Sequence, residues 1–381
     1  MSWKLKSLDQ LGYISRGRSR HRPRDAAHLY NGPYPFVQTG DVKHAGLYLT
    51  KYSQTYSEEG LAQSRLWEIG TLCITIAANI ADTAVLAIDA CFPDSVIGFI
   101  PEKDKADARF VKYLFDAHLQ RRYKKFTQGA AQDNLSQGKL LSLQFPVPDI
   151  HEQIEIADKI SAYDDLIDNN RRRIQLLEQA ARLLYKEWFV HLRFPGHEHA
   201  TITDGVPERW EKKQVKEILG RVKRPRKIKK SEFLDEGPIP CVDQSRDFIG
   251  GYTDDEEAVV DIGQPVIVFG DHTRILKFVD FPFACGADGT QLIVSNEEAL
   301  SQEFLYFALD SIDLSNYFYA RHFKFLKDQH IPRPLNKLLS HFTDNTRPIL
   351  KQIKLLRNQC HCLSQARDLI LPRLMNGEVP V

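Results

Sequence analysis

Two short stretches of the chain concentrate positive charge. From residue 16 to residue 24 every second residue is an arginine, and from residue 221 to residue 230 seven of ten residues are Arg or Lys and none is acidic. The formal net charge is only +1, but neutralising phosphates requires a local concentration of positive charge rather than a positive total. Solvated loops also carry such runs, but their matching places in the two halves of the chain favour phosphate contact. The residues expected to contact phosphates are Arg16, Arg18, Arg20, Arg22, Lys223, Arg224, Arg226 and Lys227.

Side chains able to read base edges occur in stretches that we expect to be loops. In the major groove Arg and Lys suit guanine, Asn and Gln suit adenine, and Ser and Thr are more permissive. Phosphate contacts position a protein on a duplex without specifying sequence, so the two sets of residues have different tasks. For each residue, a turn or surface role is the alternative. The predicted base readers are Gln38, Thr39, Asn79, Gln132 and Asn134 in the first half and Gln244, Arg246, His272, Thr273, Arg274, His322 and Lys324 in the second.

Residues with the spacing of a catalytic or metal site are hard to find in this sequence. It contains neither a Walker-type phosphate loop nor a methyltransferase signature of the Asn-Pro-Pro-Tyr type. Asp94, Glu102 and Lys103 are superficially similar to a metal-dependent nuclease site, but the lysine is displaced by one residue and the second half has no equivalent. The Cys-His-Cys stretch at 360–362 cannot aim three side chains at one metal from a helix. We therefore expect no catalytic residue and no metal.

The composition is that of an ordinary globular protein. No apolar run approaches the roughly 18 residues of a membrane span, and the first residues, Met-Ser-Trp-Lys, do not resemble a signal segment. The six cysteines are mostly scattered singly, which is typical of reduced thiols. We expect a cytoplasmic protein.

A long amphipathic helix in the middle of the chain must position these residues. From residue 160 to residue 188, side chains of one seam recur in alternating steps of three and four, which is heptad spacing. Roughly forty residues at a rise of 1.5 Å give a rod of about 60 Å. The alternation recurs from 349 to 370, so the two helices can pair antiparallel; the alternative is two helices packed on separate cores. The predicted pairing residues are Ile160, Ile167, Ile174, Leu177, Leu184, Trp188, Ile349, Ile353, Leu356, Leu363 and Ile370.

The two halves of the chain are similar to each other, which indicates a domain duplication with a period of about 190 residues. Each half opens with a tryptophan, Trp3 or Trp210, and continues through its basic run into short apolar segments. Helix-like stretches are expected at 110–126 and 304–319, followed by polar loops at 129–135 and 321–327. The predicted strands are Tyr34–Gln38, Leu72–Ala77, Ala84–Ile88, Val96–Ile100, Pro240–Asp243, Val266–Phe269, Ile275–Val279 and Gln291–Val294.

These patterns predict an α+β fold. It consists of two tandem, pseudo-repeated α/β domains separated by two long helices that pair as an antiparallel coiled coil. The predicted boundaries are 1–148 for the first domain, 149–195 for the central helix, 196–207 for a linker, 208–338 for the second domain and 339–381 for the C-terminal helix.

Several segments resemble the specificity subunit of Type I restriction–modification systems, and the resemblance covers nearly the full chain. Residues 145–153, Phe-Pro-Val-Pro-Asp-Ile-His-Glu-Gln, are similar to the Pro-rich start of that family's central conserved helix. Residues 183–190 look like the end of that helix, and residues 369–378 look like the C-terminal signature. Shorter matches to the family's recognition domains are Gly40-Asp41, 129–132 and 269–274.

The second half departs from the family pattern before its long helix. It is expected to lack the Pro-x-Pro and Glu-Gln start, because Leu-Asn-Lys-Leu-Leu at 335–339 and Thr-Asp-Asn at 343–345 stand there instead. We therefore expect the second helix to begin less sharply than the first.

The resemblance implies that each globular half is a target recognition domain for one part of a split DNA sequence, with the helical pair fixing their distance. It implies two adenine-methylating modification subunits and ATP-driven restriction subunits as partners. S-adenosylmethionine, ATP and magnesium would belong to those partners. The alternative is a coiled-coil scaffold whose globular ends bind proteins. Salt separates the two, because phosphate-based binding weakens steeply as salt rises.

Overall fold

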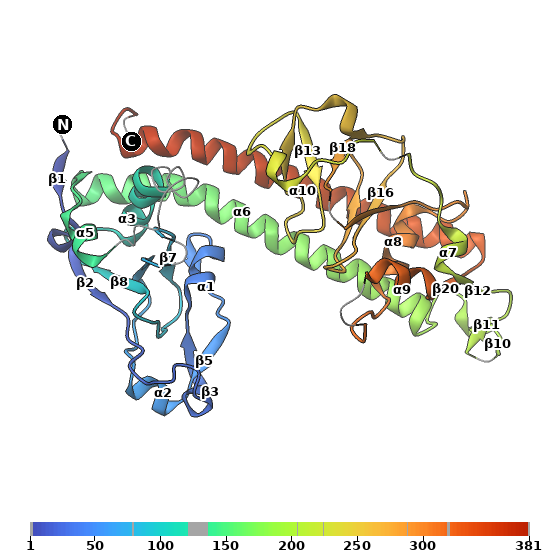
Figure 1. The fold of residues 1–381 in the computed structure, drawn as a ribbon, viewed down its shortest axis with the longest axis horizontal. Helices are drawn as coiled ribbons and strands as arrows, with labels where there is room; N and C mark the ends of the chain where they lie inside the picture. The colour runs from blue at the N-terminus through green and yellow to red at the C-terminus, as the bar shows by residue number, and fades with distance from the viewer. Residues whose placement is uncertain are drawn as a thin grey trace. The chain divides into compact units, whose positions relative to one another are not determined.

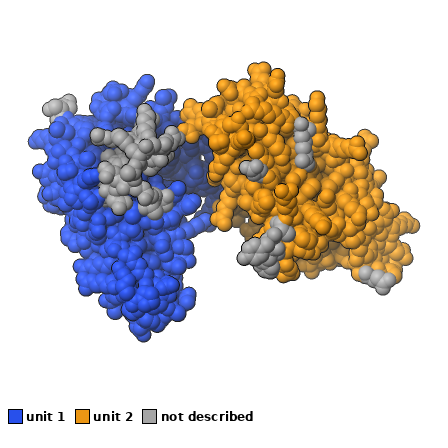
Figure 2. All heavy atoms as spheres, in the orientation of Figure 1, with its two compact units in different colours: residues 1–172, 356–381 blue, residues 173–355 orange. Residues whose placement is uncertain are grey.

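The computed structural model describes residues 3–77, 80–120, 136–203, 205–223, 225–287, 289–317 and 321–379. The chain divides into two compact units, which Figure 2 colours separately. Unit 1 comprises residues 1–172 and 356–381, and unit 2 comprises residues 173–355. Each unit includes part of both long helices. The predicted boundaries, which treat each long helix as a segment separate from the globular domains, therefore stay a prediction.

Unit 1 contains a five-stranded sheet in the order β2-β8-β6-β7-β4, in which the β4–β7 pair is parallel and the other pairs are antiparallel. Helix α3 packs on β6, β7 and β8 and buries Phe110, Val111 and Leu114. Two further antiparallel pairs, β1–β9 and β3–β5, complete the unit. The elements are β1 Lys4–Lys6, β2 Gly12–Arg16, β3 Tyr30–Phe36, α1 Thr39–His44, β4 Tyr48–Leu49, β5 Gln54–Tyr56, α2 Glu58–Ala62, β6 Leu72–Thr75, β7 Thr83–Leu86, β8 Val96–Pro101, α3 Ala108–Phe115 continuing as a π-helical turn Asp116–Gln120, α5 Gln137–Ser142 and β9 Phe145–Val147.

Unit 2 contains a three-stranded antiparallel sheet, β17-β16-β19, and a four-stranded mixed sheet, β14-β13-β18-β15. Helix α8 packs against β16, β17 and β20 and is buried over nearly its whole length. The elements are β10 Ile202–Thr203, β11 Val206–Pro207, β12 Glu211–Gln214, α7 Val215–Ile218, β13 Ile239–Val242, β14 Gly251–Thr253, β15 Val259–Val260, β16 Val266–Gly270, β17 Leu276–Val279, β18 Phe283–Cys285, β19 Thr290–Ile293, α8 Gln302–Asp310, α9 His322–Asp328 and β20 His330–Arg333.

The two units repeat one topology, which confirms the predicted duplication. The antiparallel trio β7-β6-β8 of unit 1 corresponds to β17-β16-β19 of unit 2. A parallel bridge joins Phe36 to Cys91 in unit 1, and the parallel pair β13–β18 stands at the matching place in unit 2. In each unit the strand that follows the opening tryptophan pairs antiparallel with the last strand, as β1–β9 and β12–β20.

The long helices are α6, Ile150–Tyr185, which continues as a π-helical turn over Lys186–Val190, and α10, Asn336–Met375 (Figure 1). In unit 1, Asp164 contacts Arg367 and Asn170 contacts Gln359, so residue numbers rise along one helix as they fall along the other. The predicted antiparallel pairing is therefore confirmed. Of the predicted seam, the buried residues are Ile160, Ile167, Trp188, Ile353 and Leu356, and the half-buried ones are Ile174, Leu177, Leu184, Ile349, Leu363 and Ile370.

Some predicted elements were wrong. The helix expected at 304–319 ends at Asp310, and the turn that follows is closed by the Ser315 amide donating to Asp313 at 2.8 Å. The polar loop expected at 321–327 is instead helix α9, because the Asp271 carboxylate, distant in sequence, accepts the Phe323 amide at its first turn.

The start of the second long helix also differs from the prediction. Strand β20 is followed by Pro334, so Ile-Pro-Arg-Pro at 331–334 supplies the Pro-x-Pro motif that the second half was expected to lack. Because β20 pairs with β12 as β9 pairs with β1, this motif occupies the same place as residues 145–148. The helix begins at Asn336, three residues before the predicted 339.

Candidate nucleic-acid interface

Three loops of unit 2 converge at the ends of its strands. Gln244 follows β13, His272 and Thr273 follow β16, and Gly289 precedes β19. The Gln244 side-chain oxygen accepts the His272 amide at 3.1 Å, and the Thr273 hydroxyl donates to the Gln244 carbonyl at 2.7 Å. A Cβ on Gly289, whose φ is +67°, would lie 2.6 Å from His272 and 2.9 Å from Gln244. The structure therefore brings together three predicted base readers that lie 29 residues apart at most in sequence.

Two further predicted base readers, His322 and Arg274, contact backbone carbonyls next to this cluster. His322 is buried, and its ring nitrogens lie 2.9 Å from the Asp271 carbonyl and 3.0 Å from the Tyr317 carbonyl. Arg274, at φ +62°, donates to the Leu314 carbonyl at 3.0 Å. Both ring nitrogens of His322 lie against backbone carbonyls, so we remove His322 from the set of base readers. Arg274 is exposed and its bond to Leu314 uses one of the five N–H groups of a guanidinium, so it stays a predicted base reader. Lys324 is exposed on α9.

A buried lysine that the sequence did not single out braces the loop after β13. Lys277 is 4% exposed, and its ammonium donates to the Asp247 carbonyl at 2.5 Å and lies 3.7 Å from the Asp243 carboxylate. That carboxylate also accepts the Ser245 amide at 3.0 Å. The loop between these contacts carries Gln244 and exposed Arg246. A lysine inside an apolar strand is the signal that could have found this brace.

The second basic run lies against the same loops. Lys227 donates to the carbonyls of Ala287 and Thr290, at 3.4 and 3.2 Å, which flank Gly289. Arg226 pairs with Glu232 at 2.6 Å and Asp255 at 2.9 Å. Lys223 is exposed. Four predicted residues, Asn79, Gln132, Asn134 and Arg224, lie outside the described residues.

In unit 1 the first basic run flanks the strand that leads to Gln38. The Arg18 amide donates to the Phe92 carbonyl at 3.0 Å, and the Val37 amide donates to the neighbouring Cys91 carbonyl at 2.8 Å. Arg22 donates to the carbonyls of Ser19 and His21, which closes the loop of the run. The side chains of Arg16, Arg18, Arg20 and Arg22 are exposed.

Gln38 meets a second glutamine that the sequence analysis missed. Its amide nitrogen donates to the Gln54 side-chain oxygen at 2.5 Å, where β5 begins. Thr39, the first residue of α1, is half-buried. A polar hollow of about 390 Å³ lies beside Gln54. In sequence, Gln54 stands in a short polar stretch with no feature that separates it from any surface strand.

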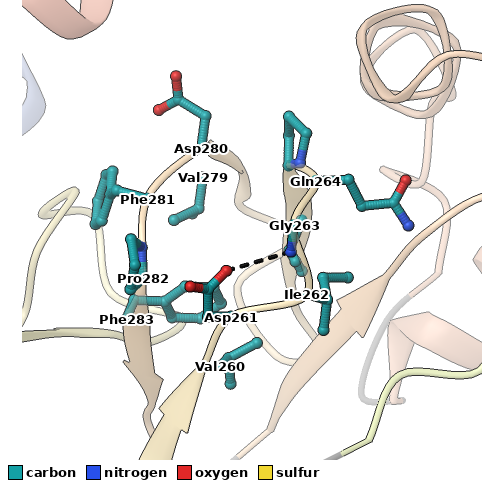
Figure 3. A pocket seen from close by; sticks show the side chains of 12 residues that line it. Val260, Asp261, Ile262, Gly263, Gln264, Val279, Asp280, Phe281, Pro282 and Phe283 are labelled. Atoms are coloured by element: carbon teal, nitrogen blue, oxygen red, sulfur yellow. Dashed lines mark hydrogen bonds between the residues drawn. The ribbon is translucent and has the colours of Figure 1, made fainter.

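Another hollow, in unit 2, does not suit nucleic acid (Figure 3). Residues 260–266 and 279–283 line it, and its volume is about 210 Å³. Its lining has two carboxylates, Asp261 and Asp280, and no basic side chain. Asp261 accepts the Gly263 amide at 3.2 Å, and Asp280 pairs with Lys354 at 3.2 Å. These groups stabilise the turn and the packing of α10.

The two acidic residues considered for a nuclease site lie in separate ion pairs. Asp94 pairs with Arg24 at 3.0 Å, and Glu102 pairs with Lys105 at 2.7 Å. Among the described residues, no group of three His, Cys, Asp or Glu side chains could hold a metal ion. Within the same residues, no helix is both long and apolar enough to cross a membrane.

Comparison with known proteins is consistent with this geometry. The family described as Type I restriction modification DNA specificity domain matches residues 1–179. The chain is 22% identical to the Type I restriction enzyme MjaIX specificity subunit of Methanocaldococcus jannaschii, over 100% of this chain and 94% of the relative. It is also 22% identical to the MjaVIII specificity subunit of the same organism, over 68% and 67%. Its fold is similar to the crystal structure of a Type I restriction-modification S subunit from M. genitalium, with a TM-score of 0.59, 15% identity, and coverage of 98% and 96%.

Proposed function

We propose that this chain, whose residues 1–179 match the family described as Type I restriction modification DNA specificity domain, is the DNA-recognition subunit of a Type I restriction–modification complex. The observation that carries the proposal is the convergence in unit 2 of a basic run with loops bearing Gln244 and His272. Concentrated positive charge supplies affinity for phosphates, and amide and imidazole groups beside it supply base readout.

In this proposal each unit reads one half of a bipartite target, and the paired helices set the spacer between the halves. The helices also dock two modification subunits and the restriction subunits. The chain itself is non-catalytic, and S-adenosylmethionine, ATP and magnesium act in the partners. The complex works in the cytoplasm, where its DNA target lies.

Methylome sequencing tests the proposal. Cells carrying the modification subunit are compared with and without this chain. A split, adenine-methylated motif that depends on the chain supports the proposed function and names the target. No new motif, with the modification subunit present and active, would contradict it and favour a protein-binding scaffold.

The salt dependence of binding should report individual phosphate contacts. In the complex with the modification subunit, Arg18→Ala should reduce the slope of log affinity against log salt by about 0.9, because each phosphate contact releases condensed counterions. Arg24→Ala in the same run is the control, since its guanidinium already pairs with Asp94 at 3.0 Å. Titrations between about 50 and 200 mM salt measure both slopes. Equal slopes in the two variants would contradict the phosphate role of Arg18.

Gly289→Ala should damage the loop cluster of unit 2. A left-handed residue with a Cβ costs about 1–2 kcal/mol, and here the Cβ also collides with His272 and Gln244. Gly263→Ala is a matched control, because its φ is +70° but nothing lies within 4 Å of its Cβ. Gly289→Ala should lose more stability than Gly263→Ala in chemical denaturation, because the collision adds to the backbone strain that both share. Only Gly289→Ala should weaken binding to the target duplex. Equal loss of binding in both would show that the loops do not contact DNA.

A further inference from the structure

We propose that the paired side-chain amides of Gln38 and Gln54 read one adenine in the half-site that unit 1 contacts. This inference rests on the proposed function and adds the identity of one base to it. The two residues come from different elements, Gln38 from the residue before α1 and Gln54 from the start of β5, and the Gln38 Nε2 donates to the Gln54 Oε1 at 2.5 Å.

Both glutamines are held in place by the surrounding backbone. Gln54 lies opposite Phe36 in the β3–β5 register, and the Gln38 backbone N–H donates to the Asp41 carboxylate at 2.8 Å. The same carboxylate accepts the Ser53 hydroxyl at 3.1 Å, which ties the β5 loop to the first turn of α1. A pre-organised pair loses little conformational entropy on binding, so its hydrogen bonds discriminate between bases more sharply.

The free hydrogen-bonding groups of Gln54 match adenine. Its Oε1 keeps one lone pair after accepting from Gln38, and an amide nitrogen offers two N–H groups. Within the described residues no hydrogen bond uses those two N–H groups. In the major groove adenine presents an N6 donor and an N7 acceptor side by side, so one amide satisfies both. Guanine presents two acceptors there, and the Gln54 oxygen would oppose one of them.

The surroundings of Gln54 favour nucleic acid over an acidic or apolar ligand. The adjoining hollow of about 390 Å³ is lined by hydroxyl and amide groups, among them Tyr30, Asn31 and Tyr52, and by no carboxylate. The Tyr30 hydroxyl donates to the Arg24 carbonyl at 2.8 Å, so the hollow adjoins the end of the first basic run. Lys51 is exposed next to it in sequence. Phosphate-binding and base-reading groups therefore lie together in unit 1.

The test uses the full chain with its modification subunit and duplexes in which each base pair of the target is replaced in turn. Wild type should prefer A·T at one position of one half-site by about 5- to 150-fold, the range of a bidentate contact. Gln54→Ala should remove most of this preference. Gln54→Arg should move the preference at that position to G·C, because arginine reads guanine. The other half-site and the spacer should be unchanged.

Ser53→Ala is the control for a merely structural role, because it breaks the Ser53–Asp41 bond and leaves both amides. It should keep adenine as the preferred base, with a smaller preference than wild type because the pair is less well pre-organised, whereas Gln54→Ala removes most of the preference. Base preferences identical to wild type in both Gln54 variants would overturn this inference and leave the proposed function standing. Loss of the whole half-site in Ser53→Ala as well as in Gln54→Ala would also overturn it, because the loop would then act as a scaffold. A wild-type complex that recognises no split site would overturn the proposed function together with this inference.

Discussion

Asp164→Ala should lower the free energy of unfolding of the chain by about 3–5 kcal/mol, because it removes one partner of a buried ion pair. Asp164 on α6 is buried and accepts the Tyr113 hydroxyl from α3 at 2.6 Å and the Arg367 guanidinium from α10. Burial and the neighbouring Asp164 raise the pKa of Tyr113 above its ordinary value, so its hydroxyl remains a donor. The alanine variant leaves the Tyr113 hydroxyl without its acceptor and leaves Arg367 with the exposed Asp368 as its carboxylate partner. Urea denaturation of the purified chain measures the loss.

Two companion variants separate the ion pair from a general effect of the substitution. Asp165→Ala makes the same change at the next, exposed residue and should alter stability by about 0.5 kcal/mol or less. The double variant Asp164→Leu with Arg367→Leu should recover the part of the lost stability that comes from the unpaired charge, because both charges are replaced. The Tyr113 hydroxyl still lacks its acceptor in this variant. If Asp165→Ala were as damaging as Asp164→Ala, or the double variant worse than either single one, the ion pair would not be the cause.

The helix pair was predictable because its signal is periodic. Heptad spacing places one stripe of side chains on one face, whatever the rest of the fold does. The exact residue that is buried at each position of the seam was not predictable. Between Ile160 and Ile167 the alternation of three and four falls on Tyr163, but Tyr163 is half-buried and the neighbouring Asp164 is the buried residue. Arg367 falls between Leu363 and Ile370 in the seam of the C-terminal helix although it is charged, and its ion-pair partner is Asp164. A charged residue in a seam identifies its partner only when the register of the two helices is known.

The types of residue in the candidate interface could be predicted from the sequence, but the role of each residue could be predicted less well. Sequence indicates which side chains can read bases, and Gln38 and His272 do lie in loops at strand ends. It does not indicate which are consumed by tertiary hydrogen bonds, and His322 supports the loop that carries its neighbours. Gln54 is distinguished only by its contact with Gln38, and Lys277 stands out in its apolar strand, but its contact with Asp247 is not indicated by the sequence. Such roles depend on long-range contacts, which no local pattern records.

Lengthening both long helices by one heptad should lengthen the spacer of the DNA target by about three base pairs. Seven helical residues add about 10 Å, and successive base pairs are about 3.4 Å apart. The insertion in α6 belongs between Ile174 and Leu184. Because the helices run antiparallel, α10 needs a matching heptad between Phe342 and Leu356, the stretch that follows the Phe342 ring contact with Tyr185. Methylome sequencing of cells carrying the variant and the modification subunit reads the new motif directly.

The comparison with a heptad in α6 alone shows whether the pair or a single helix acts as the ruler. That variant displaces the partners on one side of the insertion, for example Tyr185 from Phe342, and should lose methylation rather than shift the spacer. The paired insertion keeps each seam contact and should leave both half-sites unchanged, because no loop of either unit is altered. A motif whose half-site bases change, or whose spacer stays constant although methylation persists, would show that the helices do not set the distance.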